Sequence, residues 1–115
     1  MPTPLAALEA FALHLPGAFR DTPWDDNAVA KVGKKIFVFF GAGEPVTITV
    51  KLPDSSDHAL STPGAQPSSY GLGKHGWVTV PVGSDAPPDL LQDWIEESYR
   101  TIATKRLVAE LDARG

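Results

Sequence analysis

The sequence predicts an α+β protein, a two-layer sandwich in which helices cover one face of an antiparallel β-meander sheet. Three observations lead to this prediction. β-rich runs joined by tight turns fill the middle of the chain, while helical patterns fill both ends. The first two connections between strands are too short for a parallel crossover, which needs about a dozen residues or more, so the strands run antiparallel. Apolar residues alternate with polar ones along the strands, so one sheet face needs covering by the helices.

The first half of the chain is predicted to contain one helix and three strands. Apolar residues from Leu5 to Leu15 recur at helical spacing, and Pro16-Gly17 ends the helix. The segment Ala18–Asp26, with Pro23, Trp24 and two acids, is predicted to be an ordered loop in which Trp24 packs. The three strands follow with turns at Gly33-Lys34 and Gly41–Pro45, and they are Asn27–Val32, Lys35–Phe40 and Val46–Lys51.

The second half is predicted to contain a short helix, a strand and a long helix. The short helix, Ser55–Leu60, has Asp54 as its expected cap. A loop rich in Pro, Ser and Gly, Ser61–Gly76, leads to the strand Trp77–Val82. After Pro87-Pro88-Asp89 apolar residues are spaced four apart and predict one long helix, namely Leu91, Ile95, Tyr99, Ala103, Leu107 and Leu111. The expected order of elements is therefore α-β-β-β-α-β-α.

Length and composition fit one domain that spans residues 1–115. The chain has no cysteine, which excludes disulfides, thiolate nucleophiles and cysteine-based metal sites. The apolar N-terminus lacks the positive leading segment of an export signal, and no stretch approaches the roughly 20 apolar residues that span a bilayer. We therefore expect a cytoplasmic protein without membrane contact.

Charge is unevenly distributed along the chain. The formal net charge of -4 disfavours indiscriminate phosphate binding. Residues 27–53 nevertheless carry four lysines and one acid, whereas residues 85–112 carry seven acids and three basic residues. The central strands therefore form the candidate anion-binding region, and most of the acidic end is expected to be a solvated helix face.

No pattern of catalytic or metal-ligating residues stands out. Gly71–Gly76 matches the dinucleotide-binding sequence G-x-G-x-x-G. That motif must follow a strand and open a helix, whereas here it follows a loop and opens a strand. The three histidines, His14, His58 and His75, lack the spacing that places two metal ligands on one helix face. Asp25-Asp26 is expected in a turn or cap, and Ser98-Tyr99 is expected to supply a structural hydroxyl and a core ring. We predict a non-enzymatic protein with no cofactor and no metal.

The polar face of the sheet is the remaining candidate surface. Three strands supply its residues, which are Thr47, Thr49 and Lys51 on one, Trp77 and Thr79 on another, and Lys35 or Phe37 on a third. Such a mixture suits base stacking and phosphate contact. It suits a protein partner equally well, and an ordinary solvated face with Trp77 covered by the Ser/Gly loop is the third interpretation.

The chain resembles the MmcQ/YjbR-like family over nearly its whole length. The resemblance lies in the order and spacing of several short motifs, which are Leu15-Pro16-Gly17-Ala18, Trp24, Lys31–Phe37, Val50-Lys51, Tyr70-Gly71, Gly76-Trp77-Val78 and Ser98-Tyr99. It implies a sandwich like that of frataxin or secretion chaperones, with two β-hairpins proposed to act as wings on DNA. The corresponding positions here are Lys31, Lys34, Lys35, Lys51 and Lys74, with Tyr70 and Trp77 adjoining them.

Two function classes follow, and a third is kept open. The first is a DNA-binding or regulatory module that contacts phosphates through the basic meander and the Lys74-His75 turn. No arginine lies between Asp21 and Tyr99, so bidentate reading of guanine is not expected from this region. The second is an adaptor that binds a peptide, a protein partner or a second copy through the sheet face or an edge strand. An enzyme would need a pocket joining Asp25, His75 and Tyr70.

Overall fold

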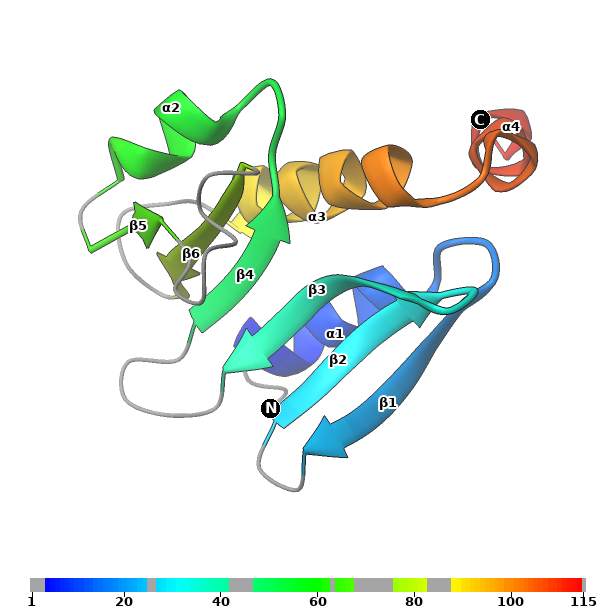
Figure 1. Cartoon of the computed structure of the whole chain (residues 1–115), viewed down its shortest axis with the longest axis horizontal. Helices are drawn as coiled ribbons and strands as arrows, with labels where there is room; N and C mark the ends of the chain where they lie inside the picture. Colours follow the sequence, from blue (N-terminus) through cyan, green and yellow to red (C-terminus); the bar gives the residue numbers. More distant parts are fainter. Residues whose placement is uncertain are drawn as a thin grey trace.

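The computed structural model describes residues 4–24, 27–41, 47–62, 64–67, 76–82 and 88–114. Four helices lie in this part of the chain, namely α1 (Pro4–Leu13), α2 (Ser56–Leu60), α3 (Pro88–Ile102) and α4 (Lys105–Ala113). Six strands accompany them, namely β1 (Ala18–Trp24), β2 (Asn27–Val32), β3 (Lys35–Gly41), β4 (Thr47–Lys51), β5 (Gln66–Pro67) and β6 (Trp77–Pro81). Helices α1 and α3 lie behind the sheet in Figure 1. The predicted α+β sandwich is therefore confirmed.

The strands form one antiparallel sheet in the order β1-β2-β3-β4-β6-β5. The first four strands make a meander, and β6 adds beside β4 after the chain has passed through α2. The four predicted strands are confirmed, with ends that agree to within a residue. One register row across the sheet joins Val29, Phe39, Thr49 and Thr79.

Strand β1 corrects the sequence analysis, which expected a loop at Ala18–Asp26. β1 pairs with β2 from Ala18 opposite Val32 to Trp24 opposite Asn27, with an irregularity between Asp21 and Trp24. The segment lacks the alternating apolar residues that would have predicted a strand. It contains a proline, which an edge strand such as β1 tolerates because it bonds to a neighbour on one side only. The two-residue strand β5 was also missed, inside the loop expected at Ser61–Gly76.

The single long helix predicted after Pro87 is wrong, because the chain breaks at Ala103-Thr104 between α3 and α4. At 3.6 residues per turn, residues four apart advance by about 40° around a helix, so five such steps turn the stripe by about 200°. One straight helix cannot present that stripe to one core. The side chain of Thr104 caps α4 by accepting a hydrogen bond from the Leu107 amide at 3.3 Å.

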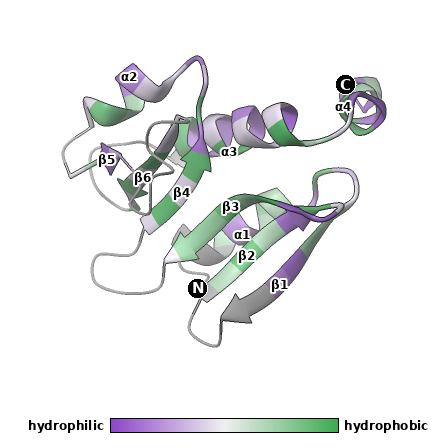
Figure 2. Cartoon of the chain, viewed as in Figure 1, coloured by the Kyte–Doolittle hydropathy of each residue, from purple (hydrophilic) through white to green (hydrophobic). Residues whose placement is uncertain are grey.

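The main core lies between the helices and the sheet. It contains apolar residues from α1, four strands and α3, among them Leu8, Ala12, Phe40, Ile48, Val50, Val78, Val80, Trp94, Ile95 and Tyr99. Figure 2 shows hydrophobic residues running along β2, β3 and β4. The opposite face of the sheet, which we call the outer face, was expected to be exposed. It is partly buried instead, since Val29 is fully buried and Trp77 is only 9% exposed.

Three consecutive residues of α3 each bind a different element. The Glu97 carboxylate accepts hydrogen bonds from the amides of Asp54 and Ser55 at 3.2 and 3.1 Å. Glu97 thus holds the turn before α2, and the predicted cap at Asp54 is wrong, because Ser55 is the N-cap residue and makes no side-chain cap bond.

Ser98 and Tyr99 serve the structural roles predicted for them. The Ser98 hydroxyl accepts from the Lys51 amide of β4 at 2.9 Å and donates to the Phe37 carbonyl of β3. The Tyr99 hydroxyl donates to the Pro16 carbonyl in the turn after α1 at 2.6 Å. Burial raises the pKa of Tyr99 above its usual value of 10.0, and the charge of Glu110 adds to the rise. Helix α3 therefore connects strands β3 and β4 to the turn after α1.

Candidate nucleic-acid interface

The turn between β2 and β3 presents two lysines to solvent. Gly33 forms the turn at a φ of +65°, a left-handed backbone that glycine adopts without strain. Lys34 and Lys35 follow it and are both exposed. Neither forms an ion pair with another residue of the described chain. The hairpin therefore holds two ammonium groups at its tip, available to an anion.

Lys31 lies on the outer face and is engaged by neighbours on β1. Its Nζ is 3.2 Å from the Asp21 carboxylate and 6.0 Å from the centre of the Phe19 ring. Phe19 stands directly opposite Lys31 in the β1–β2 register. Because the Asp21 charge offsets that of Lys31, this lysine adds little positive potential to the surface.

Lys51 and Trp77 lie opposite one another where β4 ends and β6 begins. Lys51 is half-buried, and the Trp77 ring packs edge-on against Phe39 with 5.6 Å between ring centroids. The indole is covered and is not available as a stacking platform. Phe37, considered as an outer-face aromatic, is instead fully buried in the main core against Tyr99, because a register shift in β3 turns it to the helix side.

Three other predicted site residues, Tyr70, Lys74 and His75, lie outside the described residues, as do Asp25 and Asp26. Lys34 and Lys35 stand together at the turn, and Lys31 lies one register step from Lys35 on β2. Lys51 lies on β4, opposite Trp77 of β6. Within the described ranges no group of three or more metal-ligating side chains comes together.

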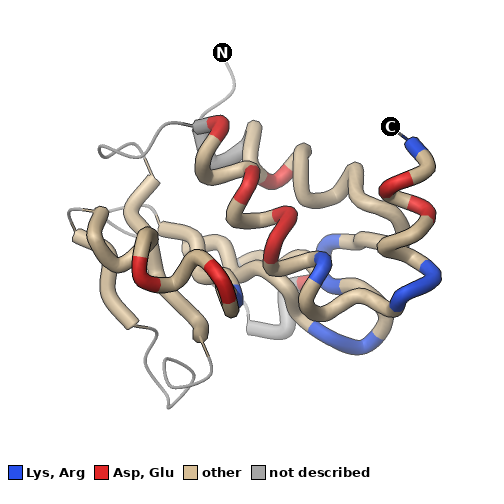
Figure 3. The backbone as a smooth tube through the Cα atoms, turned by 90° about the horizontal axis from the view of Figure 1, so that it is seen from above, with Lys and Arg blue, Asp and Glu red and all other residues tan. Residues whose placement is uncertain are grey.

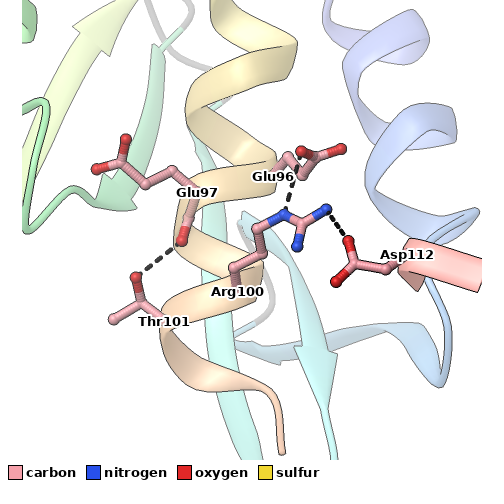
Figure 4. Close-up of polar contacts among 5 residues, drawn as sticks. All are labelled: Glu96, Glu97, Arg100, Thr101 and Asp112. Atoms are coloured by element: carbon pink, nitrogen blue, oxygen red, sulfur yellow. Dashed lines mark hydrogen bonds and ion pairs between the residues drawn. The ribbon is translucent and has the colours of Figure 1, made fainter. Parts of the chain in front are cut away.

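Acidic residues collect on the helix layer. A shallow depression of about 460 Å³ is lined by residues of α3 and the turn before α2, which are Asp54, Asp93, Glu96, Glu97, Arg100 and Thr101. Figure 4 shows Arg100 between two carboxylates, 3.2 Å from Glu96 and 2.8 Å from Asp112. The hydrogen bond to Asp112 raises the pKa of Arg100. This side of the molecule would repel a polyanion.

Basic residues collect at one end of the molecule. Figure 3 shows most of the Lys and Arg segments toward the end that carries the C-terminus, while acids mark the helices, including the last one. Lys105 and Arg106 were not predicted as site residues, because in the sequence they belong to an acidic helical segment. The adjacent basic pair after Thr104 was the available signal. Both residues are exposed at the start of α4.

Fold and site together define a small α+β sandwich protein with a partly buried outer sheet face and a basic hairpin turn. The family model described as YjbR matches residues 13–101, so the chain belongs to the YjbR family. A crystal structure of a protein from Pseudomonas syringae is similar in fold, with a TM-score of 0.65 and 21% identity. That match covers 80% of this chain and 92% of the other. No match was found among curated proteins.

Among the described residues, none of the helices combines the length and the apolar character that a membrane span requires.

Proposed function

We propose that this protein is a non-enzymatic nucleic-acid-binding protein that contacts the phosphate backbone through the β2–β3 turn. The observation that carries the proposal is the pair Lys34-Lys35, exposed at a hairpin tip and without an acidic partner in the described chain. Phosphate contacts supply most of the affinity in such complexes, because bound lysines release condensed counterions. A protruding hairpin also reaches a groove or backbone more readily than a flat face does.

The geometry favours duplex nucleic acid and binding without sequence preference. Single-strand binders rely on exposed aromatic rings that stack on bases, whereas Trp77 is only 9% exposed and packs edge-on against Phe39. The turn carries lysines rather than arginines, so it lacks the planar fork that reads guanine in two bonds. With a net charge of -4, we expect weak affinity, with a Kd of about 10⁻⁴ to 10⁻⁶ M at physiological salt.

A second candidate is contact with a peptide or a second copy through edge strand β1. Phe19 on β1 is 45% exposed on the outer face, and an edge strand offers unpaired backbone groups to an added strand. Size-exclusion chromatography with light scattering tests the second copy. A stable dimer that Phe19→Ser dissociates would support it, and a monomer at all concentrations would exclude that form.

Fluorescence anisotropy with a labelled 20-base-pair duplex tests the leading proposal across a salt series. The variant Lys34→Gln/Lys35→Gln is compared with Lys31→Gln/Lys51→Gln, which removes the same charge from the outer face. We expect the slope of log K against log salt to fall by about 2 in the turn variant, since each phosphate contact contributes about 0.9. Absence of wild-type binding at low salt, or equal losses in both variants, would overturn the proposal.

A further inference from the structure

The family match ends at Thr101, before helix α4 begins. We propose that Lys105 and Arg106 of α4 join Lys34 and Lys35 in one phosphate-binding surface for the backbone of duplex nucleic acid. We call these four residues the basic end. This inference rests on the proposed function, which by itself needs only the turn.

Packing of α4 brings the two basic pairs to the same end of the molecule. A Cβ atom placed on Gly17 would lie 3.2 Å from a Leu107 methyl and 3.8 Å from a Val32 methyl, so α4 meets the end of β2 across this glycine. Val32 directly precedes the turn that carries Lys34, and Leu107 directly follows Arg106. Figure 1 shows α4 and the β2–β3 turn at the same side of the molecule.

The carboxylates of α4 form no ion pair with these four residues. All four residues of the basic end are exposed, and none forms an ion pair within the described ranges. Asp112 is held by the Arg100 guanidinium at 2.8 Å. Glu110, the other described acid of α4, lies four residues after Arg106, a spacing that makes the two side chains neighbours, although they form no ion pair. On α4, one carboxylate not held by Arg100 therefore remains beside the solvent-exposed cations of the basic end.

Fold stability does not account for the basic pair on α4. The first turn of a helix carries partial positive charge, and cations placed there destabilise the helix by about 0.3–1 kcal/mol each. Acids are absent from the first turn of α4. Phosphates bound near Lys105 and Arg106 would remove this repulsion. Because the basic end spans two elements, it suits a repeating polyanion better than a single phosphate group.

Three variants that each remove two positive charges test the inference by anisotropy on the same duplex. They are Lys105→Gln/Arg106→Gln, Lys34→Gln/Lys35→Gln and the outer-face control Lys31→Gln/Lys51→Gln. Glutamine keeps the helix propensity of Lys and Arg, and a thermal melt checks that each variant is folded. We expect the α4 and turn variants each to lower the salt slope by about 2, and all four substitutions together by about 4.

The outcomes separate this inference from the proposed function. If the α4 variant binds like the control while the turn variant is weakened, the role of α4 is refuted and the proposed function stands. If the wild type does not bind at low salt, both fail. Competition by poly-glutamate at the same charge concentration as the duplex would refute a nucleic-acid partner, and failure to compete would support it.

Discussion

Replacement of Ser98 by alanine removes a single oxygen atom, but we expect it to lower the stability of the fold strongly. The Ser98 side chain is fully buried, and its hydroxyl joins β3 to β4 by bonding both the Lys51 amide and the Phe37 carbonyl. Alanine cannot make either bond. A buried carbonyl and a part-buried amide would then lose their partner at the point where the pairing of β3 and β4 ends, beyond Val38 and Val50.

The expected loss follows from these two groups. An orphaned buried donor or acceptor costs about 1–3 kcal/mol, so the buried Phe37 carbonyl and the part-buried Lys51 amide together cost about 2–5 kcal/mol. The higher helix propensity of alanine offsets roughly 0.5 kcal/mol of this loss in the free energy of unfolding. We therefore expect the free energy of unfolding to fall by about 3 kcal/mol, and the Tm by about 12 °C for a domain of this size.

Urea denaturation followed by circular dichroism measures this loss. Thr101→Ala is the matched control, because it also removes a hydroxyl from α3. The Thr101 hydroxyl is exposed and donates to the Glu97 carbonyl of the same helix at 2.8 Å. The control should lose under about 0.5 kcal/mol. Equal losses in the two variants would show that Ser98 does not bridge the strands.

Two further predictions concern the N-terminal turn and α4. Tyr99→Phe should cost about 1–2 kcal/mol at neutral pH, because the Pro16 carbonyl loses its donor. Because burial raises the pKa of Tyr99 in the folded state, its hydroxyl stabilises the fold below pH 10, and this contribution declines as pH rises above about 10. Urea titrations from pH 8 to 11.5 should show the difference between wild type and Tyr99→Phe shrinking, and a constant difference would contradict this. Gly17→Ala should destabilise more than Gly33→Ala, as measured by urea midpoints. Both adopt a left-handed φ, but only at Gly17 would the new methyl meet Leu107, at 3.2 Å. Equal losses would mean that α4 does not pack on this turn.

Sequence patterns predicted the central strands well because each carries its own burial signal. Ile48 and Val50 alternate with Thr47 and Thr49, and the alternation matches the two faces of β4 in the structure. The same local logic predicted the structural use of Ser98 and Tyr99. Strand β1 carries no such signal, since its pairing depends on the neighbouring strand β2 rather than on its own residues.

The candidate site residues also divide into those that the sequence could predict and those that it could not. Lys34 and Lys35 could be predicted from the sequence because a glycine turn exposes whatever follows it. The accessibility of Trp77 and Lys31 could not, because it depends on Phe39 and Asp21, which other strands bring beside them. Lys105 and Arg106 were overlooked because the break before α4 redirects the helix.

The sequence by itself determined the class of fold, the central strands and the exposed turn, because alternation, glycine turns and short connections act within about ten residues. Only the tertiary structure decided which lysines remain free, that α4 turns back toward β2, and that the outer face is partly covered. Those features depend on pairs of residues far apart in the chain, and their contacts form only when the sheet and helices pack together.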